Sequence, residues 1–437
     1  MTLRTMLRGT VAAAAVAASV LLTGATATPT PTPTPPPVPD NPADPVRALE
    51  YWLDGAGIRE AWHTTRGEGV TIAVIDTGIG KVPGTFGDAV VGGIDVSGSG
   101  APDGRKPVGT LDPNHGSWVA SVAAGRGKAD GTGMIGVAPE ANQLSVSIGF
   151  GAAAVVPFVD QIAEGIRWAV DNGADIINMS LTTNTLDWDK SWDDAFLYAY
   201  EHDVVIVVAA GNRASGTDIV GAPATIPGVL TVAGVDQTGT ASVDASTQGI
   251  TIGIAAPSER LLGISADGEL VRWDGTSGAA PIVAGVAALI RSAHPELDAA
   301  NVINRIIKTA LPVPGVSELP DPLYGYGLLD ASEAVSASVP LVDANPMGDL
   351  AEWVRLYRRA DAEPAPEPEA TPIEVAPLPA ADPPTEAGSP LLPSAESLRY
   401  GTLPLIVLTV PGILFGLGVT AAARRIRSAR TQRTPNP

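Results

Sequence analysis

The segment Val70-Thr71-Ile72-Ala73-Val74-Ile75-Asp76 starts with six apolar or β-branched residues and ends in a carboxylate. Glycines flank it at Gly69 and Gly78, so the pattern predicts a short strand that is buried on both faces, as in a parallel sheet. Ligands and catalytic groups in open α/β sheets gather at the carboxyl ends of the strands. We therefore expect Asp76 at such an edge, although an aspartate before Thr77-Gly78 fits an ordinary turn equally well.

One of the four histidines has a sequence context suited to a general base. His63, His202 and His294 lie in polar stretches or next to a helix end, and we expect them at the surface or as caps. His115 instead opens the small-residue run 116–124, which predicts a tightly packed helix. A neutral imidazole near a helix start is a good base when a carboxylate orients it, although a lone histidine is more often structural.

The segment Gly275-Thr276-Ser277-Gly278-Ala279-Ala280-Pro281 precedes the apolar run 282–290 and predicts a buried helix with the proline near its start. Ser277 would lie at the positive end of this helix dipole, among small neighbours that let a substrate carbonyl approach. In isolation, a serine there is more often an ordinary N-cap. The G-x-S-x-G elbow of α/β hydrolases fails because its last position is Ala279, so an esterase of that fold is disfavoured.

The order Asp76, His115, Ser277, with each residue in a context suited to its role, resembles the subtilisin-like serine proteases. The resemblance implies a three-layer α/β fold, in which helices flank a central and mostly parallel sheet. It also implies an Asp-His-Ser catalytic triad made by these three residues. Asn212, which follows the apolar run 204–210, then corresponds to the side-chain donor that binds the oxyanion beside the Ser277 N–H.

The segment Asp175-Ile176-Ile177-Asn178-Met179-Ser180-Leu181 resembles the strand along which these proteases pair an extended peptide. The family usually continues with glycine after the Ser-Leu pair, but this chain has Thr182. We expect Thr182 to narrow the pocket for the residue before the scissile bond and to favour small side chains there. The expected substrate-binding residues are Ser180, Leu181, Thr182, Ala210 and Gly211.

The segment Gly131-Thr132-Gly133-Met134-Ile135-Gly136 formally matches the G-x-G-x-x-G dinucleotide-binding motif. It follows a loop rather than a strand, and Pro139 blocks a helix after it, so we interpret it as a loop of the protease fold. The expected chemistry needs no cofactor. Structural calcium is common in the resembled family, but no cluster of ligands in the sequence assigns a metal site.

Both ends of the chain indicate export and membrane anchoring. A basic start, an apolar run over 11–22 and a small-residue cleavage site predict a secretory signal peptide, residues 1–27. Residues 403–423 are uncharged and, at about 1.5 Å each, are long enough to cross a bilayer core of about 30 Å. Because five arginines follow, we expect a single membrane pass with the protease outside the cell and the basic tail, 424–437, in the cytoplasm. A buried core helix is the alternative for this span.

Composition divides the exported part into a packed domain and its flanking segments. The whole chain has 47 acidic and 27 basic residues, and the signal and C-terminal segments contribute seven arginines, so the exported part carries a formal charge of −27. Such a surface argues against nucleic acid or anionic lipid as a partner. The chain has no cysteine, so the core must form without disulfides. The expected parts are a Pro/Thr-rich leader (28–47), a protease domain (48–340), a short amphipathic segment (341–361) and a Pro/Ala/Glu-rich stalk (362–402).

This arrangement of signal, leader, protease, stalk, span and basic tail resembles the mycosins, the membrane-anchored subtilisin-like proteases of actinobacterial type VII secretion systems. The resemblance implies an extended polypeptide substrate, with the membrane and the membrane components of such a system as partners. The chain departs from that pattern in lacking cysteine and in having Gly278 where the family usually has a larger residue after the nucleophile. Two alternatives remain: a structural scaffold of a secretion complex with secondary proteolysis, and a surface degradative or leader-processing protease.

Overall fold

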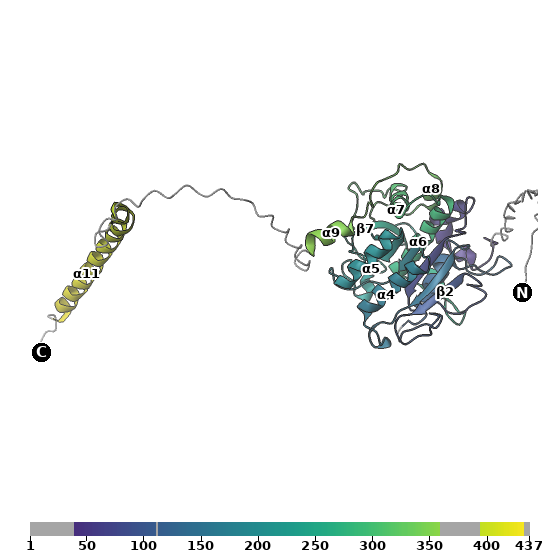
Figure 1. The fold of residues 1–437 in the computed structure, drawn as a ribbon, viewed down its shortest axis with the longest axis horizontal. Helices are drawn as coiled ribbons and strands as arrows, with labels where there is room; N and C mark the ends of the chain where they lie inside the picture. Colours follow the sequence, from purple (N-terminus) through teal and green to yellow (C-terminus); the bar gives the residue numbers. More distant parts are fainter. Residues whose placement is uncertain (1–38, 111, 359–393, 432–437) are drawn as a thin grey trace, which may run out of the picture. The chain divides into compact units, whose positions relative to one another are not determined.

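The computed structural model describes residues 39–110, 112–358 and 394–431 (Figure 1). The predicted signal peptide, most of the predicted leader and most of the predicted stalk lie outside these ranges. The chain divides into two units, Met1–Ala362 and Glu363–Pro437, which are described separately.

A seven-stranded parallel sheet forms the centre of the first unit, in the order β2-β3-β1-β4-β5-β6-β7. The predicted strand at 70–76 is β1, and its last five residues are buried. Because β1 pairs with both β3 and β4, the chain extends the sheet on both sides of it, and its carboxyl end lies where ligands usually bind. The strands are β1 (Thr71–Asp76), β2 (Val90–Asp95), β3 (Asn142–Ser147), β4 (Ile176–Met179), β5 (Val205–Ala209), β6 (Leu230–Val235) and β7 (Ile252–Pro257).

Helices cover both faces of this sheet and complete the expected three-layer fold (Figure 1). Alternate residues of β1 divide between the two cores, because side chains of a strand point to opposite faces. Val74 belongs to the core that contains α3 and α6, and Ile75 to the core that contains α4 and α5. Asp76 follows the parity of Val74, so its carboxylate faces the α3 side. The helices of the first core are α1 (Tyr51–Gly55), α2 (Ile58–Ala61), α3 (His115–Ala124), α6 (Thr276–Ala293), α7 (Ala299–Lys308) and α8 (Ala331–Ser336), and those of the second are α4 (Phe158–Asp171), α5 (Lys190–Glu201) and α9 (Leu350–Tyr357).

An antiparallel hairpin of β8 (Leu261–Ile264) and β9 (Leu270–Trp273) packs along α3 and leads directly into α6. The Ile264 N–H donates to the Ser121 hydroxyl at 3.1 Å. The Ala266 N–H donates to the Asn114 side-chain oxygen, also at 3.1 Å. The hairpin is therefore held against both ends of α3.

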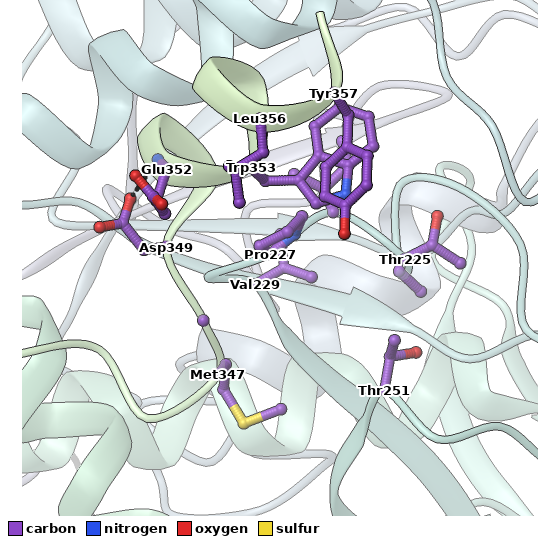
Figure 2. A pocket seen from close by; sticks show the side chains of 13 residues that line it. Thr225, Pro227, Val229, Thr251, Met347, Asp349, Glu352, Trp353, Leu356 and Tyr357 are labelled. Carbon is purple, nitrogen blue, oxygen red and sulfur yellow. Dashed lines mark hydrogen bonds between the residues drawn. The ribbon is translucent and has the colours of Figure 1, made fainter.

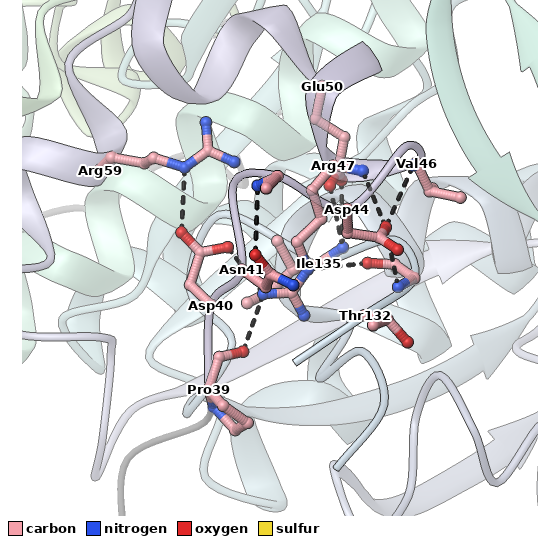
Figure 3. Close-up of polar contacts among 12 residues, drawn as sticks. Pro39, Asp40, Asn41, Asp44, Val46, Arg47, Glu50, Arg59, Thr132 and Ile135 are labelled. Atoms are coloured by element: carbon pink, nitrogen blue, oxygen red, sulfur yellow. Dashed lines mark hydrogen bonds and ion pairs between the residues drawn. The ribbon is translucent and has the colours of Figure 1, made fainter. Parts of the chain in front are cut away.

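The last residues of the predicted leader, 39–47, pack on the domain, so the folded unit begins earlier than the composition indicated (Figure 3). Arg47 is buried and donates to the Asp40 carboxylate at 2.7 Å and to the Gly133 carbonyl at 2.9 Å. Asp40 also accepts from Arg59 of α2 at 3.0 Å. These charge-assisted contacts explain why a segment rich in proline is nevertheless ordered here.

The G-x-G-x-x-G loop, 131–136, is the surface on which this N-terminal segment docks. The Gly131 carbonyl accepts the Asn41 N–H at 3.2 Å, and just after this segment the Glu50 carboxylate accepts the Ile135 N–H at 3.1 Å. Burial raises the pKa of Glu50 well above its usual value. The loop has no helix after it, in agreement with the sequence interpretation.

The helix α9, which lies in the predicted amphipathic segment, packs on the rest of the first unit. Leu350 enters the core, and the Trp353 ring packs against the Trp188 ring at a tilt of 37°, with centroids 4.5 Å apart. Arg358 pairs with the buried Asp193 carboxylate at 2.9 Å. A shallow apolar pocket of about 390 Å³ lies beside the exposed side of α9 (Figure 2). The contacts of α9 thus combine an aromatic pair and an ion pair with apolar burial.

The second unit is helical over its described residues. Its helices are α10 (Ala395–Ser397), the π-helical turn Leu398–Thr402 and α11 (Leu403–Thr431). By length and composition, the run Ala395–Ser428 could cross a membrane, because it contains a stretch of 18 residues with a mean hydropathy of 2.2, none of which is buried. The other described helix of that kind is the core helix α6, 78% of which is buried. The apolar helix begins at Leu403, where the span was predicted, but continues past 423 into the arginine-rich segment.

Candidate active site

Asp76 and His115 meet at the carboxyl end of β1. Asp76 ends the strand with 1% of its surface exposed, and His115 Nδ1 lies 2.8 Å and 2.9 Å from its two carboxylate oxygens. Thr77 connects the two elements, since its hydroxyl donates to the Pro113 carbonyl and accepts the Gly116 N–H, both at 2.8 Å. The Thr77 N–H also donates to Asp76 at 2.7 Å. Thr77 was not among the predicted site residues, because its role in joining β1 to the start of α3 depends on contacts between segments that are distant in the sequence.

The electrostatics of His115 favour a protonated state more than those of a free histidine. Burial lowers the pKa of His115, but the charge of Asp76, its hydrogen bond and the more distant charge of Asp112 raise the pKa by more. An ionised carboxylate can only accept hydrogen bonds, so the ring nitrogen Nδ1 is the donor to Asp76. In the neutral ring, Nε2 is then the atom able to take a proton.

Ser277 lies in the first turn of α6 and shares a cleft of about 560 Å³ with His115. Its hydroxyl donates to the Ser180 carbonyl at 3.2 Å rather than to the imidazole. In return, the Ser180 hydroxyl donates to the Ser277 carbonyl at 2.8 Å and accepts from the Asn178 amide at 3.0 Å. These contacts tie the start of α6 to the segment that follows β4.

Asn212 follows β5 and is held by Thr276, the residue before the serine. The Asn212 side-chain oxygen accepts both the Thr276 N–H at 2.8 Å and the Thr276 hydroxyl at 2.9 Å. Because a backbone N–H can only donate, the atom that faces it must be the oxygen, and the amide NH₂ remains available as a donor. The Thr276 hydroxyl also accepts the Gly211 N–H at 3.0 Å. Thr276 is a second residue that the sequence did not single out.

Four of the five predicted substrate-binding residues line this cleft: Ser180, Leu181, Thr182 and Gly211. Ala210 does not line it. Along β5 the side chains alternate, so Val207 and Ala209 face the core of α3 and α6, whereas Val208 and Ala210 face the opposite core. Ala209 therefore takes the place predicted for Ala210 in the cleft wall.

Two threonine methyl groups crowd Gly211, a cleft residue that has a left-handed backbone with φ of 103°. A Cβ atom built on this glycine would lie 2.5 Å from the Thr217 methyl group and 3.0 Å from the Thr182 methyl group. Both threonines line the cleft, so their side chains crowd the same point. Thr217 is 35 residues from Thr182 and carries no sequence signal that connects the two.

The other histidines lie outside the cleft. His63 is exposed near Glu60, while His202 and His294 are the C-cap residues of α5 and α6. Within the described ranges, no three His, Asp or Glu side chains cluster as ligands for a metal ion. The contacts therefore single out His115 among the four histidines.

Comparisons with known proteins match the region that carries this cleft. A sequence model described as the Subtilase family matches residues 67–327. Mycosin-4 of Mycobacterium tuberculosis is 32% identical over 332 residues, which cover 65% of this chain and 69% of that protein. Fervidolysin of Fervidobacterium pennivorans is 32% identical over 324 residues, but the chain spans only 44% of its length.

A solved structure gives the same match in three dimensions. It is described as the serine protease MycP1, an essential component of the type VII (ESX-1) secretion system. Its chain is 30% identical in sequence, with a TM-score of 0.56 over 68% of this chain and 91% of that chain. The segment that matches the family includes every residue of the cleft described above.

Proposed function

Because this chain belongs to the subtilase family of serine endopeptidases, we propose that Ser277 is its nucleophile, His115 its general base and Asp76 the carboxylate that orients the base. One observation carries the assignment: both Asp76 oxygens contact His115 Nδ1 beside a cleft that also contains Ser277. The likeness to mycosin-4 makes the chain a mycosin-like subtilase.

The proposed reaction is acyl transfer from a peptide to the serine and then to water. The Ser277 hydroxyl leaves the Ser180 carbonyl, gives its proton to His115 Nε2 and attacks the substrate carbonyl. Asp76 stabilises the imidazolium, which then protonates the departing amine. Water then attacks the acyl carbon while His115 takes one of its protons, and the imidazolium returns that proton to the Ser277 oxygen as the acid product leaves. No step requires a metal or a cofactor.

The negative charge of the tetrahedral intermediate needs donors that are already in place. The Ser277 N–H belongs to the first turn of α6, where N–H groups have no acceptor within the helix. The Asn212 amide NH₂ is the second proposed donor, because its oxygen is committed to Thr276. Two fixed donors in a partly buried cleft stabilise such an oxyanion strongly.

The proposed substrate is an extended polypeptide that pairs with the segment from Ser180 to Thr182. Crowding of Gly211 by two threonine methyl groups supports a preference for small side chains before the scissile bond. Such a pocket rejects larger residues by overlap rather than by charge.

We further propose that residues 1–27 are a signal peptide. The apolar helix from Leu403 would then anchor the protein in the cell membrane, with the protease domain outside the cell. Its length and hydropathy support the anchor, and the arginines after 423 support a cytoplasmic tail. The likeness to MycP1 supports a place in type VII secretion, with membrane components of that system as partners. A scaffold role with secondary proteolysis remains the main alternative function.

The first test is active-site labelling of the full-length protein in detergent. A fluorophosphonate probe should label the wild type but not the Ser277→Ala variant. Labelling of Ser277→Ala would reject Ser277 as the nucleophile. Absence of labelling in a folded wild type would instead favour the scaffold function.

The second test concerns the role in the cell. A deletion strain is complemented with the wild type or with Ser277→Ala, and secretion is measured. Restoration by both would make the scaffold the main role. Restoration by the wild type alone would make proteolysis the main role, and a deletion strain with unchanged secretion would contradict a part in secretion.

A further inference from the structure

Two tryptophans enclose the imidazole of His115. The ring of Trp273 meets it edge-on, with centroids 5.6 Å apart, and the ring of Trp118 lies 6.2 Å away. The two indoles contact each other at 5.7 Å. Both line the cleft, but neither gives or takes a proton in the proposed reaction.

Both indoles are fixed by their own N–H groups. Trp118 Nε1 donates to the Ser265 hydroxyl at 2.9 Å, and Trp273 Nε1 donates to the Leu262 carbonyl at 3.0 Å. Both acceptors lie in or just after β8, the hairpin strand held against α3. The pair of rings is therefore part of the scaffold rather than a mobile cover.

Gly278 supplies the space that this arrangement needs. A Cβ atom on Gly278 would lie 2.3 Å from a methyl carbon of Leu261 and 3.4 Å from the Trp273 ring. The absence of a side chain directly after the nucleophile thus lets Leu261 and Trp273 pack against the start of α6. This gives a physical reason for the departure at Gly278 that the sequence left unexplained.

His115 needs such support because its hydrogen bond leaves one motion free. Nδ1 lies almost equally far from the two Asp76 oxygens, so the ring can swing about that contact without losing it. A swing moves Nε2, the atom that must meet the Ser277 hydroxyl. With 22% of the side chain exposed, water alone does not restrain the ring.

We propose that Trp273 is a positioning residue that fixes the plane of the His115 ring, with Trp118 as its support. The inference rests on the proposed role of His115 as general base. Trp273 acts through the imidazole, so its loss should slow the chemical step and leave peptide binding largely intact. A displacement of about 1 Å at a reacting group can cost on the order of a hundredfold in rate.

The test compares Trp273→Ala and Trp273→Phe in the full-length protein, with kcat and KM measured separately on a short peptide. We expect Trp273→Ala to lower kcat about tenfold to a hundredfold with KM changed less than about threefold. Trp273→Phe keeps a ring and should restore most of the loss. Trp62→Ala is the matched control, because Trp62 is similarly buried and its Nε1 also donates to a backbone carbonyl, that of Val137, at 2.8 Å.

Each outcome decides the matter. A folded Trp273→Ala enzyme that loses less than about tenfold in kcat overturns the proposal, as does a rise in KM alone or an equal loss in Trp62→Ala. If Trp273→Ala does not fold, Trp273→Leu replaces it, and the proposal fails when Leu is as active as Phe. His115→Ala is measured alongside. An active His115→Ala enzyme would overturn the proposed function itself and not only the role of Trp273.

Discussion

Replacement of Thr276 by valine tests how the proposed oxyanion donor is held in place. Valine has nearly the shape of threonine but lacks the hydroxyl, which is fully buried and makes two hydrogen bonds. The Gly211 N–H loses its acceptor inside the protein. Asn212 keeps one of its two donors, the Thr276 N–H at 2.8 Å.

The two effects have different sizes and appear in different measurements. A buried N–H without an acceptor costs about 1–3 kcal/mol of unfolding free energy. Asn212 loses one ordinary hydrogen bond, worth about 1 kcal/mol, and is therefore held less firmly. If that free energy is lost from the transition state, kcat should fall roughly fivefold. Complete removal of the donor in Asn212→Ala should cost about a hundredfold to a thousandfold, a range measured in subtilisin, a member of this family.

The assay combines urea unfolding with kcat on a short peptide for Thr276→Val, Asn212→Ala and the double variant. Because Thr276 acts on the reaction through Asn212, the double variant should have the kcat of Asn212→Ala alone. Thr276→Ser keeps the hydroxyl and should retain the wild-type kcat. The reasoning is refuted if the two losses in kcat simply multiply, or if Thr276→Val is as slow as Asn212→Ala.

Three further predictions concern pH, specificity and stability. In the pH dependence of kcat/KM, the acid limb should have a midpoint above the usual histidine pKa of about 6.5. Asp112→Asn should shift this midpoint to lower pH, because the charge of Asp112 raises the pKa of His115. An unchanged midpoint in Asp112→Asn would contradict this prediction. Thr182→Gly should increase cleavage after Phe and Leu in a peptide library, since it uncrowds Gly211, and a wild type that already prefers those residues would remove the basis of the prediction. Burial raises the pKa of Glu50, so the wild type should lose stability as pH rises through that raised value. Glu50→Gln should therefore unfold at higher urea at neutral pH and show a flatter pH dependence, whereas parallel curves for the two proteins would refute the argument.

The sequence predicts the elements that local pattern determines. The apolar run before Asp76 forms the central strand, and His115 and Ser277 each open a helix, as their small-residue neighbours indicated. The alternation of side chains along a strand also explains why Ala209, rather than the predicted Ala210, lines the cleft. The two side chains point to opposite faces of the sheet, and Ala209 is on the face of the cleft.

The remaining features depend on contacts that no local pattern encodes. Thr77 and Thr276 are ordinary residues until their hydroxyls meet partners from another element. Thr217 becomes part of the cleft only when its loop folds over Gly211. Residues 39–47 have the composition of a leader, yet the buried Arg47 donates a hydrogen bond to the carbonyl of Gly133, 86 residues away.

The attachment of α9 also determines how the protease would respond to mechanical load. A pull transmitted along the chain from residue 359 onward reaches α9 before any strand of the sheet. There it meets the contact between the Trp353 and Trp188 rings and the ion pair of Arg358 with Asp193. If the apolar helix from Leu403 anchors the protein as proposed, tension would peel this one helix from the domain before it loads the sheet that carries Asp76, so α9 would act as a strain relief for the active site.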